Sequence, residues 1–166
     1  MANNSLRDFS DYVEYFCRIH KQIAHTDERK HFVRLDHQEL TQSINAGLYF
    51  PVVTLEKLTI SYSDTADSFG KSRYIEMLFL DKVPDAGNFR QIEDVQSRME
   101  KLAESFIFKT RTMRRHPEWP ELRTLRIHGV EINYVSNIKS LLWGVLLSFD
   151  MEMPGRECIN EDDFIA

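Results

Sequence analysis

One stretch near the C-terminal end constrains the possible folds more than any other part of the sequence. Between residues 141 and 153 every second residue is large and apolar, which gives seven such residues in one phase. A period of two is typical of a β-strand with one face on a hydrophobic core. In the other phase the residues become polar toward the end, as in Ser148, Asp150 and Glu152. We therefore expect a long strand with one face packed on a helix and the other partly wet.

Three other segments have the pattern of α-helices. Residues 5–23 and a longer segment from Asn88 to about Arg115 carry apolar residues at three- and four-residue steps. A short helix is predicted over residues 36–47, where a cap-like start is followed by two apolar residues four apart. In the first helix the apolar stripe comprises Phe9, Tyr12, Val13, Phe16, Ile19 and Ile23. In the longest helix it comprises Phe89, Ile92, Val95, Met99, Leu102, Phe106 and Met113.

Three more segments are rich in β-branched residues that alternate with polar ones. The phase of this alternation shifts near Glu56 and again at His128-Gly129, and such a shift indicates a β-bulge. A linker of turn-forming residues, 63–70, joins the first two segments into a long hairpin. The predicted strands cover residues 51–62, 71–83 and 124–134.

The order of these elements, α-α-β-β-α-β-β, is typical of an α+β fold. We expect a four-stranded, mostly antiparallel sheet with the helices packed on one face. Residues 1–154 form a single α+β domain in this interpretation, and residues 155–166 form an acidic C-terminal extension. The core is predicted where the last strand meets the longest helix.

Charge is distributed unevenly along the chain. There are 21 Lys and Arg residues against 26 Asp and Glu residues, and a net charge of -5 argues against a general nucleic-acid binder. Residues 109–126 are basic, whereas residues 157–166 carry four acidic residues and no basic one. Either both are solvated surface segments, or one contacts the other within a chain or between chains. In the second interpretation the interface residues are Arg111, Arg114, Arg115, Arg123, Glu157, Glu161, Asp162, Asp163 and Phe164.

No segment has the pattern of a catalytic, cofactor or metal site. Gly70-Lys71-Ser72 resembles the end of a P-loop, but Thr65 stands where that motif needs its first glycine. The two cysteines form no CxxC motif, and we expect Cys17 to be a buried free thiol. Spacings of five and six residues do not suit a helical zinc pair, so a surface loop is expected for His20, His25, His31 and His37. The sequence therefore predicts no cofactor, no metal and no enzymatic activity.

Several segments together resemble the tail-terminator, or tail-completion, proteins of long-tailed bacteriophages and prophages. The likeness extends over about residues 8–164. It includes the N-terminal helix DFSDYVEYF, the lead-in AGLYFP at 46–51, the hairpin and the central helix. It continues with the final strand WGVLLSFDMEMP and the acidic end CINEDDF. An extra polar segment at 24–36 departs from the pattern, and the acidic end could also belong to another phage neck or tail protein of this fold.

The resemblance implies a structural role rather than chemistry. Proteins of this family form a ring, commonly six-fold, on the finished tail tube, where they stop tube growth and present a surface for joining the head. It implies self-association, tube and head-connector proteins as partners, and a place in the bacterial cytoplasm during assembly and then in the particle. Neither a membrane nor a nucleic acid is an expected partner. Two alternatives remain open: an α+β binding or regulatory module that uses its sheet face for a peptide or small ligand, and an enzyme with an unrecognised site.

Overall fold

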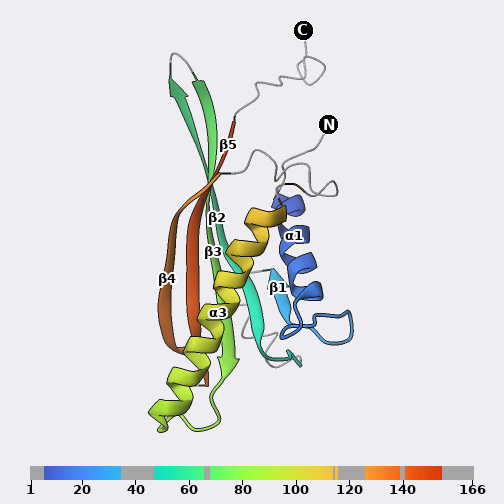
Figure 1. Cartoon of the computed structure of the whole chain (residues 1–166), viewed down its shortest axis with the longest axis vertical. Coiled ribbons are helices and arrows are strands. Elements are labelled where there is room, and N and C mark those ends of the chain that lie inside the picture. The colour runs from blue at the N-terminus through green and yellow to red at the C-terminus, as the bar shows by residue number, and fades with distance from the viewer. Residues whose placement is uncertain are drawn as a thin grey trace.

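The computed structural model describes residues 6–34, 47–65, 68–113, 115, 126–138 and 141–154. Figure 1 shows two helices that lie against one side of a long, twisted sheet. The helices are α1 (Leu6–Ile19) and α3 (Phe89–Met113). The strands are β1 (Phe32–Arg34), β2 (Val52–Thr65), β3 (Ser68–Lys82), β4 (Arg126–Ile138) and β5 (Leu142–Pro154). The predicted helix at 36–47 lies outside the described residues apart from Gly47, which is in a turn.

The sheet has five strands in the order β1-β2-β3-β5-β4 and is mixed. β1 runs parallel to β2, whereas the other three pairings are antiparallel. The α+β class is confirmed, but the prediction of four strands is wrong because β1 adds a fifth. β1 is only three residues long, and Phe32 pairs with Val53 of β2. A strand this short has too few residues to give a detectable period, and it exists because β2 offers it a free backbone edge.

The core lies between the helices and the face of the sheet that they cover, which we call the helix side. The predicted packing of β5 on α3 is confirmed, since Val145, Leu147 and Phe149 are fully buried in one cluster with the α3 stripe. The aromatic rings of Phe106 and Phe149 lie 6.2 Å apart in a tilted arrangement. Cys17 is fully buried as expected, and burial raises the pKa of its thiol.

The opposite face of the sheet, which we call the open side, is apolar at one end and polar at the other. A second cluster of buried residues lies there and consists of Val33, Val52, Leu78, Leu80 and Leu142. Along β5 this face passes from buried Leu142 to half-buried Asp150 and exposed Glu152. The expectation of a partly wet face therefore holds for the far half of the strand. Gly144 also lies on this strand, and a Cβ atom there would meet the Phe79 carbonyl oxygen at 1.9 Å.

Several local predictions can be compared directly with the structure. The bulges are confirmed, because the strand register shifts between Leu55 and Lys57 and again between His128 and Glu131. The eight-residue linker predicted at 63–70 is wrong, since β2 and β3 remain paired as far as Thr65 and Ser68. Backbone pairing with a partner strand overrides the turn propensity of these polar residues.

Two residues assigned to the helix stripes are exposed. Phe89 is 78% exposed, and Ile19 is 44% exposed. Phe89 is the first residue of α3 and Ile19 is the last residue of α1. A residue at a helix end can keep the apolar spacing and still extend past the surface on which the helix packs.

Candidate functional site

The basic residues predicted at an assembly interface are only partly within the described chain. Arg111 is exposed in the last turn of α3, and Arg115 is exposed just beyond it. Arg114, Arg123 and the five acidic-end residues Glu157, Glu161, Asp162, Asp163 and Phe164 lie outside the described residues. The predicted contact between the basic and acidic segments therefore stays a prediction.

The arrangement of the elements bears on that prediction. α3 runs antiparallel to α1, so its basic C-terminal end lies beside the N-terminal end of α1 (Figure 1). β5 ends at Pro154 toward the same end of the molecule. The fold thus brings the basic end of one element and the last residue before the acidic extension to one end of the domain, although they are far apart in sequence.

The sheet has two long edges that no described strand covers. β4 is the last strand of the sheet, and within the described chain only β5 pairs with it. At the other side β1 pairs with β2 only at Val53, Thr54 and Leu55. Residues 57–65 of β2 pair with β3 but with no other described strand. We call residues 57–65 the distal edge of β2 and residues 126–138 the outer edge of β4; an unpaired edge is a template for another strand.

Along residues 57–62 of β2 and residues 126–133 of β4, the helix side is apolar and the open side is polar. Further along β4, Val135 and Ile138 pack against the apolar cluster of the open side. On the distal edge of β2, Ile60 and Tyr62 point to the helix side and are 42% and 61% exposed. On the outer edge of β4, Ile127 and Tyr134 belong to the helix side, and Tyr134 is 59% exposed. The polar residues on the open side of these two stretches are Lys57, Thr59 and Ser61 on β2, and His128, Glu131 and Asn133 on β4. Exposed apolar side chains on an open edge are typical of an interaction surface.

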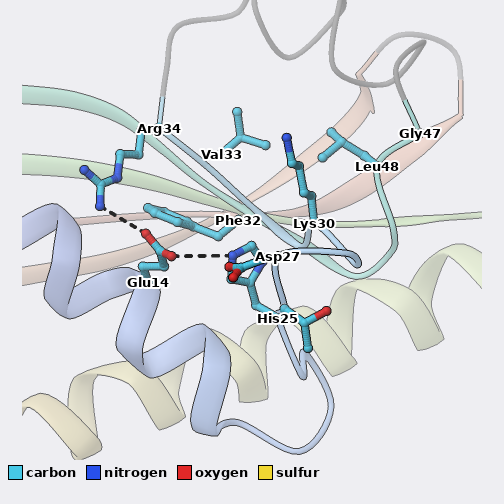
Figure 2. A pocket seen from close by; sticks show the side chains of 10 residues that line it. Glu14, His25, Asp27, Lys30, Phe32, Val33, Arg34, Gly47 and Leu48 are labelled. Carbon is cyan, nitrogen blue, oxygen red and sulfur yellow. Dashed lines mark hydrogen bonds and ion pairs between the residues drawn. The ribbon is translucent and has the colours of Figure 1, made fainter.

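A cleft of about 440 Å³ lies beside β1, between α1, β1 and the loop that joins them (Figure 2). Its lining residues are Glu14, His25, Thr26, Asp27, Lys30, Phe32, Val33, Arg34, Gly47 and Leu48. Charged groups of both signs surround one buried aromatic side chain, that of Phe32.

Glu14 is the centre of the charged network in this cleft. One of its carboxylate oxygens accepts a hydrogen bond from Arg18 Nη2 at 2.8 Å, and the other accepts one from Arg34 Nη2 at 3.1 Å. Arg34 also pairs with Asp11, and Arg18 also pairs with Asp27. The hydrogen bond from Arg18, and then that from Arg34, lower the pKa of Glu14. The network joins α1 to the three-residue strand β1.

Two buried histidines fix the loop beside this network. His25 Nδ1 accepts a hydrogen bond from the backbone N–H of His31 at 3.0 Å, so Nε2 carries the proton of the neutral ring. That Nε2 atom lies 3.8 Å from Glu14 Oε1. His31 Nδ1 donates to the Pro51 carbonyl at 2.8 Å. Burial, and then the nearby Arg18 cation, lower the pKa of His25, while Glu14 acts in the opposite direction.

The expectation of a surface histidine loop is therefore wrong for His25 and His31, and His37 lies outside the described residues. His20 is half buried, and its Nε2 atom lies 3.2 Å from Ser105 Oγ. His20 and His31 contact residues from other segments, Ser105 and Pro51, and such contacts leave no local pattern. For the charged network around Glu14, only the acids and bases at three- and four-residue steps in α1 could have given a sequence signal. In the described parts of the chain, no group of three or more His, Cys, Asp or Glu side chains could hold a metal ion.

No protein-family model and no curated protein matches this sequence. Among the helices that the structure describes, none is long and apolar enough to cross a membrane.

Proposed function

We propose that this chain is a non-enzymatic assembly protein of a phage-like tail. In this proposal identical copies form a ring that caps the finished tail tube and presents a surface for joining the head. Its partners are other copies of itself and the tube and head-connector proteins. It acts in the bacterial cytoplasm during assembly and then stays in the particle. The sequence resemblance to tail terminators supports this role.

The observation that carries the proposal is the presence, on one domain, of two different sheet edges that no described strand covers. A closed ring of identical subunits needs a heterologous contact, in which one surface of each copy meets a different surface of the next. The outer edge of β4 and the distal edge of β2 are two such surfaces, at opposite sides of the sheet. The hairpin of β2 and β3 also extends beyond the helices, where it can reach a neighbouring protein (Figure 1).

The proposal is tested by measuring tails in cells that produce the particle with and without this protein. Without it, electron microscopy should reveal tails of irregular and excessive length that lack heads. Supplying the intact chain should restore one tail length and head joining. A chain with Phe108→Ala, an exposed position on α3, should restore both equally well. Normal, head-bearing tails in the absence of the protein would contradict the proposed function.

The charged segments should steer assembly rather than supply its affinity. Exposed ion pairs contribute about 0–1 kcal/mol each. The apolar side chains of the acidic C-terminal extension would therefore have to add affinity. We expect a chain that lacks residues 157–166 to stay folded and to assemble poorly. Reversing Arg114 and Arg115 to Glu should slow assembly most at low salt. Light scattering measures both effects. If the shortened chain forms the same oligomer at the same concentration, the C-terminal extension has no role in assembly.

A second candidate function rests on the cleft between α1 and β1. A volume of about 440 Å³ lies in the range of small-ligand sites, which favours a binding or regulatory module. However, Glu14 and Arg34 already pair with each other there, and a ligand would have to compete with that ion pair. Calorimetry with a set of small anions and peptides tests this candidate. Lys30→Ala should weaken any binding that takes place in the cleft, because Lys30 lines it.

A further inference from the structure

We propose that β1 and the loop before it form a pH-sensitive clasp on the edge of β2, which His25 holds closed only while its ring is neutral. The clasp comprises residues 25–34. In the closed form, β1 covers the edge of β2 at Val53, Thr54 and Leu55. In the open form, this stretch joins the distal edge of β2, so that the longer edge becomes a template for another strand. The clasp goes beyond the proposed tail function and does not depend on it.

Backbone pairing alone holds β1 weakly. The strand has three residues, and its pairing with β2 is parallel, the slightly less stable kind. Arg34 adds ion pairs with Asp11 and Glu14 of α1, but exposed pairs of this kind contribute only about 0–1 kcal/mol each. Just before β1, the His31 carbonyl accepts a hydrogen bond from the backbone N–H of Val53 at 2.8 Å. The loop that carries His31 must therefore supply much of the attachment.

His25 ties this loop to the elements on both sides of it. Its backbone N–H donates to the Cys17 carbonyl of α1 at 3.1 Å. Its Nδ1 atom accepts from the backbone N–H of His31 at 3.0 Å. Its ring also meets the Phe32 ring of β1 edge to face, with 6.4 Å between the two centroids. Because the His25 side chain is only 7% exposed, little water reaches it to replace the bond to His31.

Protonation removes the acceptor that this arrangement needs. The neutral ring has its proton on Nε2, so a second proton can go only to Nδ1. There it would point at the N–H of His31, and two donors form no hydrogen bond with each other. His31 is buried as well, and a buried N–H that loses its partner costs about 1–3 kcal/mol. The closed clasp is therefore disfavoured once His25 is protonated.

The charged groups nearby act in both directions. Those around the ring and its neighbour Glu14 come from α1, the loop and β1, and they are Arg18, Asp27, His31 and Arg34. Glu14 favours a charged His25 ring, but its carboxylate already binds two arginines. Burial, and then the Arg18 cation, lower the pKa of His25. An open clasp, with the ring in water, binds the proton more readily and gains population as the pH falls from 7 to 5.

Amide hydrogen exchange of the full chain, followed residue by residue by NMR, tests the clasp. The amides of Val53 and His31 report on it, because their acceptors in the closed form are the His31 carbonyl and His25 Nδ1. After correction for the intrinsic pH dependence of exchange, both should exchange up to about 25-fold faster at pH 5 than at pH 7, the limit for one histidine whose pKa in water is about 6.5. At each pH they should also be less protected than the amides of β5, because the clasp opens without unfolding the domain.

His25→Asn is the decisive variant, because the Oδ1 atom of asparagine can accept from the His31 N–H but does not titrate. It should keep the two amides protected and abolish the difference between pH 5 and pH 7. The matched control is His20→Asn, the same change at a half-buried histidine that contacts Ser105 of α3 instead of His31. This control should keep the pH dependence of the unaltered chain.

Three results would each overturn the proposal. The first is equal protection of the Val53 and His31 amides at pH 5 and pH 7 in the unaltered chain. The second is an unchanged pH dependence in His25→Asn, or its loss in His20→Asn. The third is protection as high as that of β5 at both pH values, which would mean that β1 leaves the sheet only when the whole domain unfolds.

Discussion

Replacing Phe106 with alanine tests how the helices are attached to the sheet. Phe106 lies on α3 and is fully buried. Its ring lies 5.1–6.4 Å from four other aromatic rings, which come from α1, β3 and β5. These partners are Tyr12, Phe16, Phe79 and Phe149. Truncating this one side chain therefore opens a cavity where both helices and two central strands meet.

The expected loss of unfolding free energy is about 3–5 kcal/mol, the usual cost of Phe→Ala in a core. That is a large part of the roughly 5–15 kcal/mol by which such domains are stable. Phe108→Ala is the matched control, because it makes the same chemical change on the same helix where the side chain is 60% exposed. Both variants replace phenylalanine with alanine, which has the higher helix propensity, so this effect is the same in the two. Phe108→Ala should change the free energy of unfolding by no more than about 0.5 kcal/mol.

The measurement is urea unfolding followed by far-ultraviolet circular dichroism. With a urea dependence of about 2 kcal/mol per molar, Phe106→Ala should lower the unfolding midpoint by about 2 M. Phe108→Ala should leave the midpoint nearly unchanged. If both variants unfold at the same urea concentration, α3 does not pack on the sheet through Phe106, and the argument for the core is wrong.

Two further predictions concern stability. Folding lowers the pKa of His25, so below about pH 6.5 the unfolded chain binds more protons than the folded chain. The free energy of unfolding should therefore fall as the pH drops from 7 to 5. This group contributes at most about 1.4 kcal/mol per pH unit to that fall. Urea midpoints measured across that range should depend less on pH for His25→Asn, and an identical profile would contradict the assignment. Gly144→Ala should lower the free energy of unfolding by about 1–3 kcal/mol or more, because the added Cβ would meet the backbone of β3. Gly87→Ala is the control: its Cβ meets only the Asp85 side chain at 3.3 Å, and the same measurement should find it nearly neutral.

The long elements could be predicted because their side chains repeat a period many times. The alternation that ends at Met153 and the helical stripe around Phe106 each identify both the element and the face that it buries. The bulges near Glu56 and Gly129 were predictable for the same reason, since a bulge changes the phase of a pattern that is otherwise regular. The α+β class and the packing of β5 on α3 follow from these local patterns.

The candidate site was predictable only in part. Arg111 and Arg115 stand out because they belong to a basic run, and the structure places both on the surface at the end of α3. Nothing in the sequence distinguishes β4 from a central strand, because that difference lies in the strand order rather than in the strand itself. The two open edges therefore became visible only when the sheet was assembled.

The sequence by itself determined which segments are long helices and strands and which of their faces are apolar, because those properties depend on neighbours within the same segment. The tertiary structure decided the rest. β1 forms because β2 offers it an edge, and the hairpin continues past Ser63 because each strand supplies the hydrogen bonds of the other. The buried ring of His31 donates to the carbonyl of Pro51, and that of His25 lies beside Glu14 of α1. Contacts between residues far apart in the chain leave no periodic trace in the sequence, so only the folded molecule reveals them.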